Sequence, residues 1–140
     1  MHSRTRLTVR YAETDMMGIA HHSNYPIWYE AGRTDYIKLF DMTYTQIEEE
    51  GVLMPLTNLH CTFIKPAKYE DNLIIRTKVM TLSAARISFS YTVKRINEDG
   101  TETELGYGVT DHGFVDKETL RPCNIKKKLP KLYEQIKATL

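Results

Sequence analysis

A segment that is apolar on nearly every side of a helix most constrains how this chain can fold. Large apolar side chains recur at helical spacing over residues 25–40, and more of them fill the opposite face. The few charges stand at pairing distance, Glu30 with Arg33 and Asp35 with Lys38, so they can be neutralised locally. Such a helix is typical of a protein interior, and we expect the rest of the chain to cover it. Its apolar positions are Tyr25, Ile27, Trp28, Tyr29, Ala31, Gly32, Tyr36, Ile37, Leu39 and Phe40.

The start of this helix directly follows a polar turn. We expect the helix to begin near Ser23 or Asn24, because both are good N-cap residues. Pro26 suits the first turn, where its missing N–H costs nothing, and Gly18 marks the turn before it. A helix start presents unpaired N–H groups and the positive end of the helix dipole. An oxygen that becomes negative during a reaction is stabilised at such a place.

Three polar side chains stand just before the helix start: Asp15, His21 and His22. A carboxylate can act as nucleophile or general base, and an imidazole can orient a carbonyl, a water or the acid. Together they are suited to acyl transfer. Two other interpretations stay open on the residues alone, an ordinary turn-forming role for Asp15 and a two-histidine, one-carboxylate metal site. Because the spacing is not a metal-binding pattern, we expect no metal.

Composition argues against several other classes of protein. The formal net charge is +1, from 19 basic and 18 acidic side chains, so no overall field recruits nucleic acid or an anionic membrane. The first residues lack a signal-peptide core, and no apolar run approaches the roughly 20 residues of a membrane span. We therefore expect a cytoplasmic protein. Cys61 and Cys123 lack C-x-x-C spacing, which predicts neither a zinc site nor a disulfide framework.

Strand periodicity covers the start of the chain and most of its second half. Leu7, Val9 and Tyr11 alternate with polar residues as a first strand, and the run 86–96 alternates most clearly. Hairpin-length connections between the later runs favour an antiparallel sheet over βαβ units. One sheet face must cover the apolar helix, so we expect an α+β fold in a single domain, residues 1–140. The remaining runs are 53–65, 73–80 and about 103–115.

Two short helices are also expected. Thr43 and Gln46 form a capping-box pattern, and Gly51 stops the helix that follows. A short terminal helix follows a basic linker that ends at Pro130. Its apolar side carries Leu132, Tyr133 and Ile136.

The block Y-x-E-T-D-x-x-G-x-x-x-H-x-x-Y followed by E-x-x-R spans residues 11–33 and resembles the hotdog-fold acyl-CoA thioesterases of the 4-hydroxybenzoyl-CoA thioesterase type. The resemblance implies a curved antiparallel sheet of about five strands around one long buried helix. It implies that Asp15 attacks the thioester carbonyl, or activates water against it, at the helix N-terminus. The position of His22 matches a histidine of the bacterial acyl-CoA branch, which often has Asp where Glu13 stands. The resembled family uses no metal, and we expect no cofactor.

Coenzyme A carries phosphates, so cations and polar groups are expected around the pocket mouth. In the resembled family, contacts to coenzyme A often come from the turn that matches residues 83–86. Tyr11 is a candidate pocket residue, although a tyrosine at a strand end is more often the edge of a core. The candidate substrate-binding residues are Tyr11, Ser23, Asn24, Tyr25, Lys65, Ser83 and Arg86.

The leading hypothesis is an acyl-CoA thioesterase that releases a free acid and CoA. The alternatives are a thioesterase acting on acyl carrier protein and a non-catalytic hotdog module that binds acyl thioesters. Unblocked sheet edges tend to pair with another copy, and hotdog thioesterases are dimers or dimers of dimers. We therefore expect a homodimer or homotetramer with its active site near the interface. His60 and Thr62 are candidates to reach a partner's site, although such positions more often form a simple polar sheet face.

Overall fold

The computed structural model describes all 140 residues. Five strands form one antiparallel sheet in the order β1-β4-β5-β6-β3, and β2 pairs separately with β7. No helix is both long and apolar enough to cross a membrane. The strands are β1 (Ser3–Thr8), β2 (Val52–Leu53), β3 (Leu56–Phe63), β4 (Asn72–Leu82), β5 (Arg86–Ile96), β6 (Glu102–Gly113) and β7 (Val115–Asp116).

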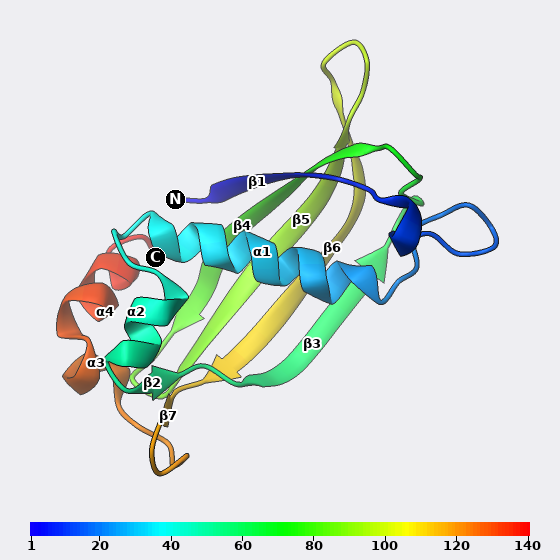
Figure 1. Ribbon diagram of the computed structural model, residues 1–140. Helices are drawn as coiled ribbons and strands as arrows, with labels where there is room; N and C mark the ends of the chain where they lie inside the picture. The colour runs from blue at the N-terminus through cyan, green and yellow to red at the C-terminus, as the bar shows by residue number, and fades with distance from the viewer.

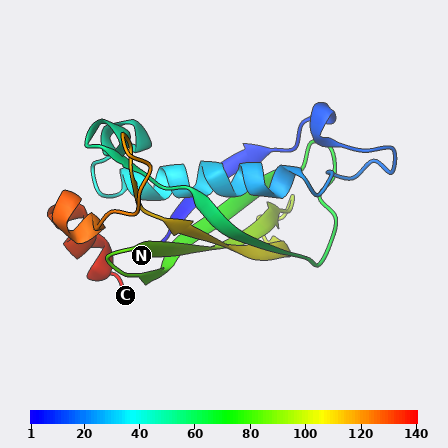
Figure 2. The same cartoon turned by 90° about the horizontal axis from the view of Figure 1, so that it is seen from below.

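One long helix, α1 (Asn24–Lys38), runs along one face of this twisted sheet (Figure 1, Figure 2). The edge strands β1 and β3 lie on either side of it in Figure 1. Three short helices gather near its C-terminal end, and a single 3₁₀ turn, η1, precedes it (Figure 1). The short elements are η1 (Tyr11–Glu13), α2 (Tyr44–Glu49), α3 (Ile125–Lys128) and α4 (Pro130–Lys137).

The core lies between α1 and the facing side chains of β4 and β5. Tyr29 of α1 stacks on Tyr91 of β5, with ring centroids 4.3 Å apart and planes 6° apart. Gly32 allows the close approach of α1 to β4, because a Cβ there would collide with the side chain of Thr77. The inward-facing half of the predicted alternation in β5 is confirmed, since Ile87, Phe89, Tyr91 and Val93 are all buried. The outward-facing half fails at Ser88, which is also buried and donates its hydroxyl to Asp111.

The predictions for α1 are partly confirmed. The helix begins at Asn24, as expected, and both predicted ion pairs form, at 3.9 Å for Glu30–Arg33 and 3.6 Å for Asp35–Lys38. The prediction that this helix is buried on nearly every side is wrong, because Ile27 is 60% exposed and Leu39 is 47% exposed. The sheet covers only one side of α1, so the opposite side is left without cover within a single chain.

The expected chain of hairpins is wrong at one place, because β3 and β4 are not neighbours. β3 lies at the far edge beside β6, whereas β4 lies between β1 and β5. The physical reason can be read in β4, where three consecutive residues, Leu73, Ile74 and Ile75, are all buried. Burial of both strand faces favours a central position. The loop of residues 64–71, called the crossing loop below, must therefore pass from the edge strand β3 across to β4, next to the opposite edge, and it passes the start of α1.

The first strand also ends earlier than expected. β1 stops at Thr8, and Tyr11 lies in η1 with 75% of its surface exposed. Val9 is completely buried, and its N–H and C=O bond Asp71 and Glu70 of the crossing loop. The chain is thus already turning away from the sheet before Tyr11. The predicted short helices are confirmed, including the Thr43 capping box of α2.

Candidate active site

A tight turn presents Asp15 just before α1. The N–H of Asp15 donates to the carbonyl of Ile19 at 2.9 Å, and the N–H of Gly18 donates to the carbonyl of Asp15 at 3.0 Å. Gly18 has a φ of 77°, which glycine adopts without strain. The Oδ1 atom of Asp15 accepts the N–H of Met17 at 2.8 Å. This side-chain bond is the turn chemistry expected of Asp, and it leaves the other carboxylate oxygen, Oδ2, without a partner in the chain.

The start of α1 has no side-chain cap. The N–H groups of Asn24 and Tyr25 donate to the carbonyls of His21 and His22, at 3.1 and 3.2 Å, and Pro26 has no N–H to offer. The helix start therefore acts on its surroundings mainly through the positive end of its dipole.

A pocket of about 350 Å³ opens where the Asp15 turn, the start of α1 and the end of β3 meet the crossing loop. It holds one carboxylate, one imidazole and one ammonium group among mostly apolar side chains. A few polar groups in an apolar hollow are typical of a small-molecule site. The lining residues are Asp15, Ile19, Ala20, His22, Tyr25, Phe63, Ile64, Lys65 and Pro66.

Aromatic contacts hold the imidazole side of this pocket. The rings of Tyr25 and Phe63 meet edge to face with centroids 4.8 Å apart, and Phe63 meets the ring of His22 at 6.5 Å. The ring of His21 lies 4.1 Å from that of His22. Because Phe63 belongs to an edge strand and is half exposed, this wall of the pocket faces the open side of the sheet.

Four of the residues suggested by the sequence line this pocket: Asp15, His22, Tyr25 and Lys65. Two others lie beside it with their polar groups engaged elsewhere. The Oγ atom of Ser23 lies 2.8 Å from Nδ1 of His21. The side-chain amide of Asn24 donates to two backbone carbonyls, those of Glu13 and His21.

Three more candidates lie away from the pocket. Tyr11 packs edge to face against Tyr69, with ring centroids 5.6 Å apart, and does not line it. Ser83 and Arg86 line a separate polar hollow of about 620 Å³, together with residues from the beginning of β3. The Oγ atom of Ser83 accepts the N–H of Arg86 at 3.1 Å, which fixes their turn. Other residues of this hollow are Thr57, Asn58, Thr81, Leu82, Ser88 and Asp111.

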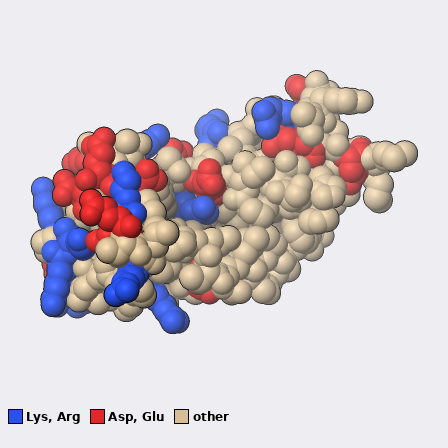
Figure 3. Space-filling view, turned by 60° about the horizontal axis from the view of Figure 1, so that its bottom comes forward, with Lys and Arg blue, Asp and Glu red and all other residues tan.

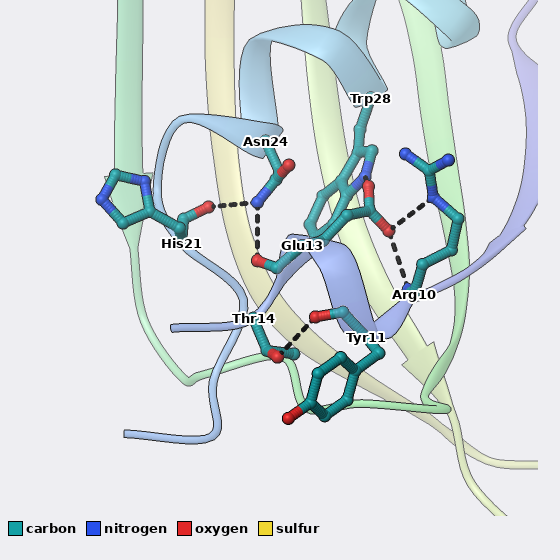
Figure 4. Close-up of polar contacts among 7 residues, drawn as sticks. All are labelled: Arg10, Tyr11, Glu13, Thr14, His21, Asn24 and Trp28. Carbon is teal, nitrogen blue, oxygen red and sulfur yellow. Dashed lines mark hydrogen bonds and ion pairs between the residues drawn. The ribbon is translucent and has the colours of Figure 1, made fainter. Parts of the chain in front are cut away.

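A buried carboxylate near the pocket that the sequence-based site residues did not include is Glu13, which accepts the indole N–H of Trp28 and the N–H of Arg10 (Figure 4). Burial pushes the pKa of Glu13 up, but these hydrogen bonds and the Arg10 guanidinium outweigh it and leave the pKa below its usual value. The signal available in the sequence was Trp28, because a buried indole N–H needs an acceptor.

The metal interpretation finds no support in the structure. No group of three or more His, Cys, Asp or Glu side chains is arranged to hold a metal ion. Asp15 and His22 line the pocket while His21 does not, so the three side chains do not converge on one point.

Comparison with known proteins assigns the fold and the family. Residues 9–136 match the family described as "Thioesterase-like superfamily". The chain is 35% identical over 129 residues to "Putative acyl-CoA thioesterase YneP" of Bacillus subtilis (strain 168), covering 91% of this chain and 90% of that protein. Among solved structures, a DHNA-CoA thioesterase from Staphylococcus aureus superposes with a TM-score of 0.89 at 29% identity, covering 98% of this chain and 91% of that one.

A 4-hydroxybenzoyl CoA thioesterase shares the fold at 19% identity, with a TM-score of 0.83 over 94% of this chain and 98% of that one. The resemblance stated from the sequence block at residues 11–33 and the predicted hotdog architecture are both confirmed. This chain belongs to the thioesterase-like superfamily and has the hotdog fold.

Proposed function

We propose that this protein hydrolyses the thioester of an acyl-coenzyme A to a free acid and CoA. The observation that carries the proposal is the pocket at the start of α1, where Asp15, His22 and Lys65 line one hollow among mostly apolar side chains. Membership of the thioesterase-like superfamily supports the thioester hydrolase activity. The names of the relatives from Bacillus subtilis and Staphylococcus aureus support coenzyme A as the carrier of the acyl group.

In the proposed mechanism, Asp15 acts through the carboxylate oxygen that the turn leaves free. That oxygen either attacks the thioester carbon or removes a proton from the attacking water. In both routes the carbonyl oxygen becomes negative, and the positive end of the α1 dipole stabilises it. The bond from carbon to sulfur then breaks, and CoA leaves as the thiolate. After direct attack, the acyl group is held on Asp15 as an anhydride, and water hydrolyses it to the free acid and the Asp15 carboxylate. After proton abstraction, the hydroxyl of the water becomes part of the acid, and Asp15 passes its proton to the thiolate. His22 orients the thioester or the water through a hydrogen bond.

We further propose that two copies of the chain pair through β3. This strand is an unpaired sheet edge without an internal proline, and large apolar side chains stand on it half exposed. Figure 3 brings this edge forward and shows a broad surface with few Lys, Arg, Asp or Glu side chains. The exposed apolar residues on and beside β3 are Leu56, Leu59, Phe63 and Ile64.

Antiparallel pairing of β3 with its own copy would join two halves of one site. The pocket with Asp15 lies at the Phe63 end of β3, and the polar hollow with Arg86 lies at the Leu56 end. In a two-fold antiparallel pair, the Phe63 end of one strand meets the Leu56 end of the other. Arg86 and Ser83 of one subunit would then approach the phosphates of a coenzyme A whose thioester lies at Asp15 of the other.

Release of free thiol from a panel of thioesters tests the proposed function. The panel should contain short aliphatic, long aliphatic and aromatic acyl-CoA, and the same acyl groups on acyl carrier protein. We expect hydrolysis of at least one acyl-CoA. Release from the carrier protein alone would move the function to that substrate. A folded dimer that binds acyl-CoA and releases no thiol would make it a binding module instead.

A further inference from the structure

The carboxylate of Glu13 ties η1 to α1 (Figure 4). Only 7% of this residue is exposed, so its charge needs partners within the protein. Its Oε2 atom accepts the indole N–H of Trp28 at 3.0 Å. Its Oε1 atom accepts the backbone N–H of Arg10 at 2.8 Å and lies 3.4 Å from the guanidinium Nε of the same residue. Both carboxylate oxygens thus have hydrogen-bond partners within the protein, and Glu13 is not among the residues that line the pocket.

The backbone carbonyl of Glu13 makes a second connection, to the segment just before α1. It accepts the backbone N–H of His21 and the side-chain amide of Asn24, both at 2.8 Å. The same Asn24 amide donates to the carbonyl of His21 at 2.9 Å. One amide group therefore bridges the two ends of the Asp15 turn and anchors both to the first residue of α1 (Figure 4).

The Asp15 turn has few other connections to the body of the protein. A bridge between Thr14 and Ala20 closes the turn on itself. A bridge between Ile19 and Lys68 and the hydrogen bond from the N–H of Ala20 to the carbonyl of Ala67, at 2.7 Å, hold it against the crossing loop. Its direction relative to α1 is set at Glu13 and Asn24. Asp15 follows Glu13 by two residues and His22 directly follows His21, so both pocket groups depend on this junction. A displacement of about 1 Å at a reacting group can cost a hundredfold in rate.

We propose that Glu13 and Asn24 are positioning residues, which hold the Asp15 turn and His22 in register with the start of α1 without touching the substrate. The inference rests on the proposed thioester hydrolysis at Asp15. It gives a role to Glu13, the Glu of the sequence block. It also gives Asn24 a positioning role in place of the substrate binding expected from the sequence.

Glu13→Gln tests the carboxylate. The glutamine keeps the size but has one oxygen, so its NH₂ group must face a donor, either the indole of Trp28 or the N–H of Arg10. We expect kcat to fall about ten- to a hundredfold, with KM changed less than about threefold because the acyl and CoA contacts remain. Arg10→Ala removes only an exposed ion-pair partner and keeps the backbone N–H bond, so a change below about threefold is expected.

A double-mutant cycle with Trp28→Phe separates positioning from general weakening. Phenylalanine keeps a ring and removes the indole N–H. In the double variant Glu13→Gln with Trp28→Phe, the NH₂ group of the glutamine can face the ring at position 28 without meeting another N–H donor. We therefore expect the loss of kcat in the double variant to be clearly smaller than the product of the two single losses.

Thr5→Val is the matched control for stability. Thr5 is similarly buried, and its hydroxyl donates to Asp35 Oδ2 at 2.7 Å, joining β1 to the other end of α1. Its loss should lower the melting temperature and leave kcat per folded molecule unchanged. Amide hydrogen exchange supplies a readout that is independent of activity: exchange over residues 14–22 should quicken in Glu13→Gln and Asn24→Ala and stay normal in Thr5→Val.

The outcomes separate the two proposals. If the unmodified enzyme turns over and Glu13→Gln matches its kcat, the positioning role is wrong and the hydrolase survives. If the unmodified protein releases no thiol, the proposed function fails. Normal hydrogen exchange over residues 14–22 in Glu13→Gln would show that Glu13 does not hold the Asp15 turn in place, whether or not the protein is a hydrolase. Equal losses of kcat in Glu13→Gln and Thr5→Val would mean that Glu13 only stabilises the fold and does not position the pocket groups.

Discussion

The Nε2 atom of His112 lies 2.9 Å from the Oγ1 atom of Thr110, and both side chains are buried in the core. The Nδ1 atom of His112 lies 3.1 Å from the carbonyl oxygen of Met54, which can only accept, so Nδ1 carries the proton. Nε2 of the neutral ring then accepts from Thr110, whose oxygen in turn accepts from the hydroxyl of Tyr91. Arg33 donates to that hydroxyl at 3.5 Å. Each group in this series therefore donates to the next, from Arg33 at one end to the carbonyl of Met54 at the other.

This arrangement predicts that the protein loses stability in mild acid. Burial lowers the pKa of His112 below the usual histidine value of 6.5, with Arg33 lowering it further, while the Met54 hydrogen bond and Asp111 oppose the shift. His112 therefore binds a proton more readily in the unfolded chain than in the folded one. Its contribution to the free energy of unfolding is fully present above about pH 6.5 and is lost as the pH falls below that value. Urea unfolding at pH 7.5, 6.5 and 5.5 measures this. The His112→Gln variant should be less stable at pH 7.5, and its stability should change less with pH than that of the unmodified protein.

Dimerisation through β3 predicts a mass of twice 16.3 kDa in sedimentation at micromolar concentration. Leu59→Lys places a charge on the proposed interface, and we expect monomers with turnover reduced at least about tenfold. Leu120→Lys is the matched control, because Leu120 is exposed in the turn that follows β7 and is not part of β3. An unmodified protein that sediments as a monomer would contradict the pairing.

A site shared between subunits predicts complementation. Arg86→Ala should raise KM for acyl-CoA by about tenfold through lost phosphate contacts, and Asp15→Asn should be nearly inactive. In mixed dimers of the two variants, one of the two sites has both normal residues. Refolding an equal mixture should therefore restore about a quarter of normal activity at low substrate concentration. No recovery would mean that Arg86 serves the pocket of its own chain or no pocket at all.

His22 is expected to act on rate without a metal. His22→Ala should lower kcat by about ten- to a hundredfold, while a chelator leaves the unmodified enzyme unchanged. The measurement is thiol release in metal-free buffer with and without the chelator. Loss of activity on chelation, reversed by zinc or iron, would place His21 and His22 in a metal site instead.

The sequence predicted the fold class because its strongest patterns are local. The inward-facing positions of β5, the start of α1 at Asn24 and the Thr43 capping box each depend on neighbouring residues, and all are confirmed. The order of strands was not predictable in the same way, since the crossing from β3 to β4 depends on which strand is buried on both faces. The exposure of Ile27 has a similar origin, because periodicity describes a helix but not what covers each side of it.

The site was predictable only where it is continuous in sequence. Asp15, His22 and Tyr25 come from one block, and the fold brings them to one pocket with Lys65. Their chemical roles remain predictions, as do the oligomeric state, the cytoplasmic location and the single functional domain. Arg86 lies at the other end of the sheet, and only an assembly of two chains would join it to this pocket.

The most direct test of the account is the turnover of Asp15→Asn. Asparagine keeps the size of the side chain and its oxygen for the N–H of Met17, so the turn should survive. It removes the negative charge needed for attack or proton abstraction. We predict a fall in kcat of at least about a hundredfold, with an unchanged melting temperature and continued binding of acyl-CoA. Turnover close to that of the unmodified enzyme would contradict hydrolysis through Asp15.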